Sequence, residues 1–237
     1  MLFPTKLQKG TLVKRYKRFL ADVELENGDL ITAHCANPGA MLGLKEPGQT
    51  VWLSPATNPK RKLKFSWELV ELKEKKTLVG INTSHPNKLV EEAIQNGTIT
   101  QLQNYQSLKR EVKYGQNSRI DLLLSNHKQK PEQHCYVEVK NAHLLREQGR
   151  AEFPDSITSR GTKHLNELST MVDEGHRAVL IYCIQRPDAE SFSLAQDIDP
   201  TYATSFANAI ENGVEAYAYS CQITPKEITI TQQIPIT

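Results

Sequence analysis

Three charged residues in the second half of the chain have a spacing that could support chemistry. Asp121 is the third residue of one short apolar segment, and Glu138 and Lys140 stand two apart in the next. Side chains of a β-strand alternate between its two faces, so Glu138 and Lys140 share a face while Val137 and Val139 point into the core. A carboxylate and an ammonium group in a half-buried strand cost solvation free energy unless a further ligand offsets that cost.

A divalent metal ion together with a phosphate would offset the solvation cost of burying Glu138 and Lys140. If the two segments pair as neighbouring strands, Asp121 and Glu138 converge and offer two oxygen ligands to a hard cation, Mg²⁺ or Mn²⁺. The metal would polarise a phosphodiester and lower the pKa of a bound water, while Lys140 would orient that water or neutralise charge in the transition state. A plain Glu–Lys pair on a solvated sheet edge is the competing interpretation.

The elements that must position these residues alternate between strands and helices. Apolar residues at helical spacing, a cap at Asp199 followed by Pro200, and apolar runs bounded by turns set the assignments. This order predicts an α/β core whose central sheet is covered by helices on both faces. The predicted helices are 87–96, one after Gly161 with Leu165, Leu168, Met171 and Val172 inward, and one with Tyr202, Phe206, Ala209 and Ile210 inward; the predicted strands are 107–114, 119–124, 136–140, 178–184 and 214–223.

The first half of the chain has a different sequence pattern, with short apolar segments separated by turns. Asn27-Gly28-Asp29 is typical of a tight turn between two strands and predicts a hairpin. About five short strands in 84 residues predict a small barrel, and an oligonucleotide-binding (OB) fold is one member of that class. The predicted strands include 19–25, 30–35, 51–53 and 67–72.

Charge is distributed unevenly between the two halves. Residues 1–84 contain 14 Lys and Arg against 8 Asp and Glu, a balance of +6, and the remainder contains 15 against 19, a balance of −4, which together give the net +2 of the whole chain. A basic module favours a polyanion such as nucleic acid, since its cations displace counterions from phosphates. A solvated basic surface without a partner explains the same numbers.

Three groups of cations are candidates for phosphate contact. One surrounds Tyr16 and Phe19, and cations mixed with aromatic rings suit single-stranded nucleic acid. Another occupies a loop after Asn58, and the last stands where a helix begins, at which backbone amides favour anions. Lys163 and Glu167 are also spaced as an ordinary surface pair, and His164 is as readily structural as functional. The candidate nucleic-acid-binding residues are Lys14, Arg15, Lys17, Arg18, Lys60, Arg61, Lys62, Arg160 and Lys163.

Several functional classes are disfavoured by composition. The chain has no apolar run of transmembrane length and no secretory leader, which predicts a cytoplasmic protein without a membrane partner. The four cysteines lack paired spacing, so a zinc site or a redox motif is not expected. Oligomeric state is undetermined, and a homodimer stays open.

Taken together, the motifs of the chain resemble a known family. An Asp on one strand followed by Glu-x-Lys on the next is similar to the PD-(D/E)XK endonuclease superfamily, and the full set resembles the sugar fermentation stimulation protein A family over nearly the whole chain. The motifs that carry the resemblance are RYKRFLAD at 15–22, HCANPGAM at 34–41, EVKYG at 111–115, SRID at 118–121, CYVEVK at 135–140, FPD at 153–155 and RGTKHL at 160–165.

The resemblance implies an OB-like barrel at 1–84 and a PD-(D/E)XK nuclease-like α/β domain at 85–237, with DNA as the partner and a link to sugar utilisation genes. It places the nuclease-like positions at Asp121, Glu138 and Lys140, with Glu92 as an acid on the helix before them. Periodicity alone does not separate Glu91 from Glu92. Ala36, Pro38 and Asn141 depart from residues common in the family and leave the loop geometry around them undetermined.

Three functions are consistent with this sequence. The first is a DNA-binding protein that contacts mainly phosphates, with the strandedness of the DNA undetermined. The second is an active Mg²⁺- or Mn²⁺-dependent nuclease with Asp121 and Glu138 as metal ligands. The third is a regulator that uses a nuclease-derived fold only to bind.

Overall fold

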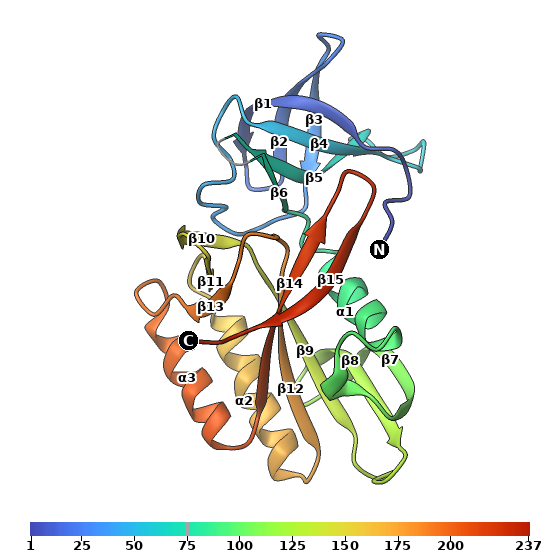
Figure 1. Cartoon of the computed structure of the whole chain (residues 1–237), viewed down its shortest axis with the longest axis vertical. Coiled ribbons are helices and arrows are strands. Elements are labelled where there is room, and N and C mark those ends of the chain that lie inside the picture. The colour runs from blue at the N-terminus through green and yellow to red at the C-terminus, as the bar shows by residue number, and fades with distance from the viewer. Residues whose placement is uncertain (74–75) are drawn as a thin grey trace.

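The computed structural model describes residues 1–73 and 76–237. It contains a β-barrel formed by the first part of the chain, stacked on an α/β domain formed by the rest (Figure 1). This architecture agrees with the predicted order of a barrel followed by an α/β core.

The barrel closes through a parallel contact between its third and fifth strands. Its strand order is β3-β2-β1-β4-β5-β6, with the additional β3–β5 pairing, so that five strands form a closed ring and the sixth extends it. Inward side chains such as Leu12, Val23 and Trp67 fill a core of their own. The strands are β1 Gln8–Tyr16, β2 Leu20–Leu25, β3 Leu30–Cys35, β4 Thr50–Pro55, β5 Phe65–Leu72 and β6 Thr77–Gly80.

Two turns connect the first three strands. The predicted hairpin between β2 and β3 is confirmed, and Gly28 has the positive φ of 87° that such a turn requires. The turn between β1 and β2 was not predicted, because it contains no glycine or asparagine. Lys17 and Arg18 adopt positive φ angles of 48° and 62° there, which places two cations at the tip of the hairpin.

The α/β domain is built on a mixed six-stranded sheet of order β15-β14-β12-β9-β8-β7. The neighbours β9, β12 and β14 run parallel, and β7, β8 and β15 are antiparallel to the strands beside them. The strands of this sheet are β7 Tyr105–Tyr114, β8 Ser118–His127, β9 Cys135–Ala142, β12 Arg177–Ile184, β14 Glu215–Ile223 and β15 Ile228–Ile234; a small second sheet contains β10 Leu144–Glu147, β11 Arg150–Phe153 and β13 Ser191–Leu194.

Helices cover both faces of the large sheet, as the sequence predicts (Figure 1). Leu89, Val90, Ala93 and Ile94 of the first helix pack on the face that carries Val137. The other two helices cover the opposite face. The helices are α1 Pro86–Gln95, α2 Ser159–Asp173 and α3 Pro200–Glu211, with a 3₁₀ turn at Thr100–Leu102.

The structure corrects two details of the helix predictions. Helix α2 begins before Gly161 rather than after it, because Thr158 caps it by accepting a hydrogen bond from the Gly161 amide at 3.1 Å. In α3 the prediction that Ile210 points inward is wrong. Its side chain is 39% exposed, while Tyr202 and Ala209 occupy the buried stripe.

Polar contacts join the barrel to the α/β domain. The Gln185 side chain donates to the Asn82 carbonyl oxygen at 3.2 Å and to Asn141 Oδ1 at 2.7 Å. Asn82 in turn donates to the buried carboxylate of Glu68, which also pairs with His85, the residue before α1. A chain of hydrogen bonds therefore runs from the barrel to the residue that follows Lys140.

A second contact forms where the barrel loop 36–41 meets the segment before α2. The Arg15 guanidinium donates to the carbonyl oxygens of Asn37 and Gly39 and holds the loop in place. The Met41 amide then donates to Asp155 Oδ2 at 3.1 Å. A Cβ on Gly39 would lie 2.5 Å from the same oxygen, so a side chain here would force the Asp155 carboxylate to shift.

The residues before β1 lie outside the barrel core. Met1, Phe3 and Leu7 belong to the core under α1, and the amino group of Met1 donates to the Ile228 carbonyl oxygen at 2.6 Å. The same amino group lies 3.0 Å from Glu92. In the described ranges, none of the helices combines the length and apolar character that spanning a lipid bilayer demands.

We expect Gly39→Ala to destabilise the protein by about 1–3 kcal/mol, because the new methyl group collides with the Asp155 carboxylate. Chemical denaturation measures the loss. In an Asp155→Ala background the same substitution should cost much less. An equal cost in both backgrounds would show that this contact does not set the requirement for glycine.

Candidate functional site

The site lies where two neighbouring strands part. Strands β8 and β9 pair only over Leu122–Leu124 and Cys135–Val137. Asp121 is the next residue of β8, and its Oδ2 accepts a hydrogen bond from the Val139 amide at 2.7 Å. Its Oδ1 accepts from Asn87 of α1, also at 2.7 Å. The carboxylate thus fills the gap between the strands and ties both to the helix.

Glu138 and Lys140 share one face of β9, as predicted. Val137 and Val139 pack on the other side in the core under α1. Lys140 Nζ donates to Glu138 Oε1 at 2.7 Å, and both side chains are largely buried. The acid–amine pair is therefore held inside the protein rather than on a solvated edge.

His164 of α2 is part of the same group. Its Nδ1 is in close contact with Glu138 Oε1, and Lys140 Nζ lies 3.4 Å from that nitrogen. Arg160 Nε donates to His164 Nε2 at 3.3 Å. These contacts suit the tautomer with its proton on Nδ1. Sequence reasoning left the role of His164 open; its position one turn after Arg160 on α2 was the available signal.

The pKa values of the two carboxylates are shifted in opposite directions. Burial, assisted by the negative charge of Glu138, raises the pKa of Asp121 to about 6 against the hydrogen bonds from Val139 and Asn87. Burial alone would also raise the pKa of Glu138, but the hydrogen bond with His164 and the charge of Lys140 bring it below its ordinary value. Near neutral pH Glu138 is therefore ionised, and Asp121 is the group that a bound cation would hold ionised.

Beside Glu138 the structure buries oxygen atoms that have no hydrogen-bond partner. They are Glu138 Oε2, the Tyr114 hydroxyl and both oxygens of Glu167. The Lys163 amine donates to the Gln116 carbonyl oxygen at 2.8 Å and stands 3.6 Å from Glu167 Oε1. Sequence reasoning named Glu167 only as a surface partner of Lys163 and did not single out Tyr114.

A metal ion at this gap would have ligands of a suitable kind. Glu138 Oε2 is buried without a partner, and the oxygens of Asp121 retain free lone pairs beyond their single hydrogen bonds. Mg²⁺ needs only one or two carboxylates when waters and phosphate complete its shell. Within residues 1–73 and 76–237, no group of three or more His, Cys, Asp or Glu side chains is arranged to hold a metal ion by itself.

Glu92 is not brought to this site. Its side chain is 48% exposed and pairs with the N-terminal amino group, while Glu91 pairs with Arg110. The residue of α1 that reaches Asp121 is Asn87, in the first turn of the helix.

The candidate cations of the barrel fall into two classes. Arg15 and Lys14 are engaged within the barrel, since Arg15 holds the loop 36–41 and Lys14 lies 3.6 Å from Asp22 Oδ2 and over the Tyr16 ring. The remaining cations occupy the β1–β2 turn and the β4–β5 loop, and for their side chains the described part of the chain shows no ion pair. They are Lys17, Arg18, Lys60, Arg61 and Lys62.

An aromatic stack lies between these two loops. The Phe19 ring stacks on the His34 ring, with 6.5 Å between centroids and 13° between planes, and Phe19 is 46% exposed. Burial, and then the positive charge of Arg61 in the β4–β5 loop, lower the pKa of His34. The two basic loops therefore meet at one end of the barrel around an accessible ring.

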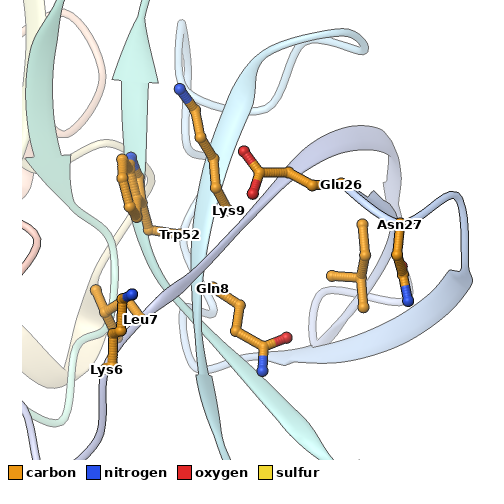
Figure 2. Close-up of a pocket in the computed structure, with 8 residues that line it drawn as sticks. Lys6, Leu7, Gln8, Lys9, Glu26, Asn27 and Trp52 are labelled. Carbon is orange, nitrogen blue, oxygen red and sulfur yellow. The ribbon is translucent and has the colours of Figure 1, made fainter.

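A hollow of about 550 Å³ opens at the other end of β1 (Figure 2). Lys9 lies over the Trp52 ring at 5.5 Å from its centroid, with Glu26 beside it (Figure 2). None of the candidate residues lines this hollow. Its lining is Lys6, Leu7, Gln8, Lys9, Leu25, Glu26, Asn27 and Trp52.

Comparison with known proteins gives consistent matches along the chain. The family described as SfsA N-terminal OB domain matches residues 13–81, and the sugar fermentation stimulation protein RE domain matches residues 84–227. A sugar fermentation stimulation protein homolog from Maricaulis maris is 54% identical over 97% of this chain and 96% of its own length. One from Ruegeria is 52% identical over 99% of this chain and 100% of its own length.

A solved structure extends this likeness to three dimensions. SfsA of Pyrococcus furiosus, in complex with Ca²⁺, superimposes with a TM-score of 0.88 at 25% identity, covering 100% of this chain and 98% of that one. The barrel, the α/β domain and their arrangement are thus those of a solved relative. The chain belongs to the sugar fermentation stimulation protein family.

Proposed function

We propose that this protein binds DNA, mainly through phosphate contacts made at the loop end of its barrel. The observation that carries the proposal is the exposed Phe19–His34 stack, flanked by the basic β1–β2 turn and β4–β5 loop. Within the described residues the side chains of these cations form no ion pair, so they can neutralise phosphates and release counterions. An accessible ring offers a base a stacking surface, which favours single-stranded segments.

A second contact region supports the proposal. Arg160 and Lys163 lie in the first turns of α2, whose amino-terminal end carries partial positive charge. The barrel loop 36–41 contacts Asp155, three residues before the Thr158 cap. Phosphates held by the barrel and phosphates held by α2 could therefore belong to one nucleic acid.

We further propose metal-dependent hydrolysis of phosphodiesters as a second function. Asp121 and Glu138 would hold Mg²⁺ or Mn²⁺ between the parted strands, and the Ca²⁺ complex of the Pyrococcus furiosus relative supports a divalent ion in this fold. Bound there, the metal would act as a Lewis acid on the phosphate. Lys140, held by Glu138 Oε1, would present its ammonium group to the charge that develops on the phosphate oxygens.

The family name connects these proteins with sugar utilisation. We propose that such an effect would follow from DNA binding, whether or not cleavage accompanies it. Normal DNA affinity in a wild-type protein without nuclease activity would identify a regulator that uses the fold only to bind.

Removing the loop cations should weaken DNA binding in a salt-dependent way. For the triple variant Lys60→Gln, Arg61→Gln, Lys62→Gln, the slope of log affinity against log salt should fall by about 2–3, because each lost phosphate contact removes roughly 0.7–0.9. Fluorescence anisotropy with labelled single- and double-stranded DNA measures the slope. The double variant Lys128→Gln, Lys130→Gln removes charge from the β8–β9 loop as a control. An unchanged slope in the triple variant would exclude this loop from the interface.

Cleavage is tested with labelled single-stranded, double-stranded and branched DNA. We expect Mn²⁺- or Mg²⁺-dependent products that EDTA abolishes and that Asp121→Ala and Lys140→Ala reduce by about a hundredfold or more. The affinity for DNA and its dependence on salt should be unchanged in both variants. Absence of metal-dependent products on all three substrates would argue against the hydrolase.

Metal binding should depend on pH through Asp121. Its pKa of about 6 lies above the ordinary 3.8, so below pH 6 a proton competes with the cation. Mn²⁺ affinity, followed by electron paramagnetic resonance, should fall by about tenfold per pH unit below pH 6 as one proton is taken up. Asp121→Asn should flatten this dependence. An identical profile in the variant would place the titrating group elsewhere.

A further inference from the structure

The turn end of the β7–β8 hairpin places two cations side by side. Lys113 of β7 and Arg119 of β8 are direct partners in the antiparallel ladder, and both side chains are exposed. Like charges directly opposite each other weaken such a ladder. Within residues 1–73 and 76–237 neither side chain forms an ion pair with a carboxylate. The pair therefore lacks a counter-charge, which an anion bound beside both cations would supply.

A pocket of about 380 Å³ opens at this end of the hairpin. Its lining combines the two cations with Ser118 and Asn117, whose side chains donate hydrogen bonds, and none of its lining residues is Asp or Glu. The hollow beside Trp52 differs in this respect, since Glu26 is part of its wall. The composition of the hairpin pocket therefore favours an anion. Its lining is Lys113, Tyr114, Gly115, Asn117, Ser118 and Arg119.

The backbone of the hairpin holds one of these cations in place. Arg119 Nη1 donates to the Glu111 carbonyl oxygen at 2.7 Å. Glu111 has a φ of 54° in the middle of a strand, a backbone angle that few residues other than glycine adopt. This bond uses one of the five N–H groups of the guanidinium, and the described residues provide no hydrogen-bond partner for the others. A guanidinium held at one edge with free donors suits a phosphate, which can accept two parallel hydrogen bonds.

The pocket lies close to the gap between β8 and β9. Arg119 stands two residues before Asp121 on β8, which corresponds to roughly 7 Å along the strand. The turn of the hairpin also contacts α2, because the Lys163 amine donates to the Gln116 carbonyl oxygen at 2.8 Å. A nucleic-acid strand bound at Asp121 would therefore have the pocket within reach of an adjacent nucleotide.

We propose that this pocket binds one phosphate group of a nucleic-acid strand, next to the phosphodiester that Asp121 and Glu138 would hold. The inference rests on the proposed function for the identity of its ligand, but it requires neither a bound metal ion nor cleavage. Lys113 and Arg119 supply the positive charge. The phosphate belongs either to the interior of the strand or to its end, and the experiment below distinguishes these two sources.

Salt dependence tests the pocket, measured in EDTA so that cleavage plays no part. For the double variant Lys113→Gln, Arg119→Gln, the slope of log affinity against log salt should fall by about 1, because one lost phosphate contact removes roughly 0.7–0.9. The double variant Lys128→Gln, Lys130→Gln, beyond the opposite end of β8, should keep the wild-type slope. Single-stranded oligonucleotides of equal length carry a 5′-phosphate, a 3′-phosphate or neither. A fall on all three assigns an interior phosphate, and a fall confined to one phosphorylated end assigns a terminal one.

Equal slopes in the two double variants on all three oligonucleotides would overturn the pocket. If the triple variant Lys60→Gln, Arg61→Gln, Lys62→Gln still lowers the slope, DNA binding by the barrel stands and only the pocket fails. A wild type without affinity for any of these oligonucleotides would instead overturn the proposed function.

Thermal unfolding tests the pocket without DNA. Wild-type Tm should rise more in sodium phosphate than in sodium chloride of the same ionic strength, because an anion that binds the folded protein stabilises it. Phosphate also stabilises proteins by exclusion from their surface, and this part is common to all variants. The additional rise should be lost in Lys113→Gln, Arg119→Gln and kept in Lys128→Gln, Lys130→Gln. The same difference between the two salts in all three proteins would show that the pocket does not bind phosphate.

Discussion

The hydrogen bond from the Val139 amide to Asp121 governs the geometry of the site. Paired strands would use that amide in their ladder, but β8 and β9 pair only as far as Leu122, the residue that follows Asp121 in the chain. A buried amide without a partner is costly, and the Asp121 carboxylate supplies one. The same carboxylate binds Asn87, so one side chain fixes the gap, the strand beyond it and the first turn of α1.

Around that gap the protein separates the roles of its acids through their surroundings. Glu138 is kept ionised by His164 and Lys140, whereas burial and the negative charge of Glu138 raise the pKa of Asp121 to about 6. Glu167 has no hydrogen bond to its carboxylate, and its Oε1 lies 3.6 Å from the Lys163 amine. The three carboxylates thus differ in their surroundings, although their intrinsic chemistry is nearly the same.

Much of this structure could be predicted from sequence, and the failures have physical causes. The helical period of α1, the continuous apolar run of β12 and turn residues such as Gly28 carry local signals, and the shared face of Glu138 and Lys140 follows from strand geometry alone. The four-residue strands β10, β11 and β13 are too short to show a period. The place of Glu92, the reach of Asn87 and the burial of Tyr114 depend on how α1 and β7 dock, which no local pattern encodes. His164 joins the site only because α2 crosses β9.

The junction between the barrel and the α/β domain has an evolutionary consequence. A side chain at Gly39 would displace the Asp155 carboxylate, and Gln185 bridges Asn82 and Asn141 from the two units at once. A chimaera that takes its barrel from one homologue and its remaining sequence from another would mismatch these partners unless both sides of the junction were exchanged together. The barrel and the α/β domain should therefore be inherited together. A protein that combines them from two homologues should fold only when those homologues are close relatives.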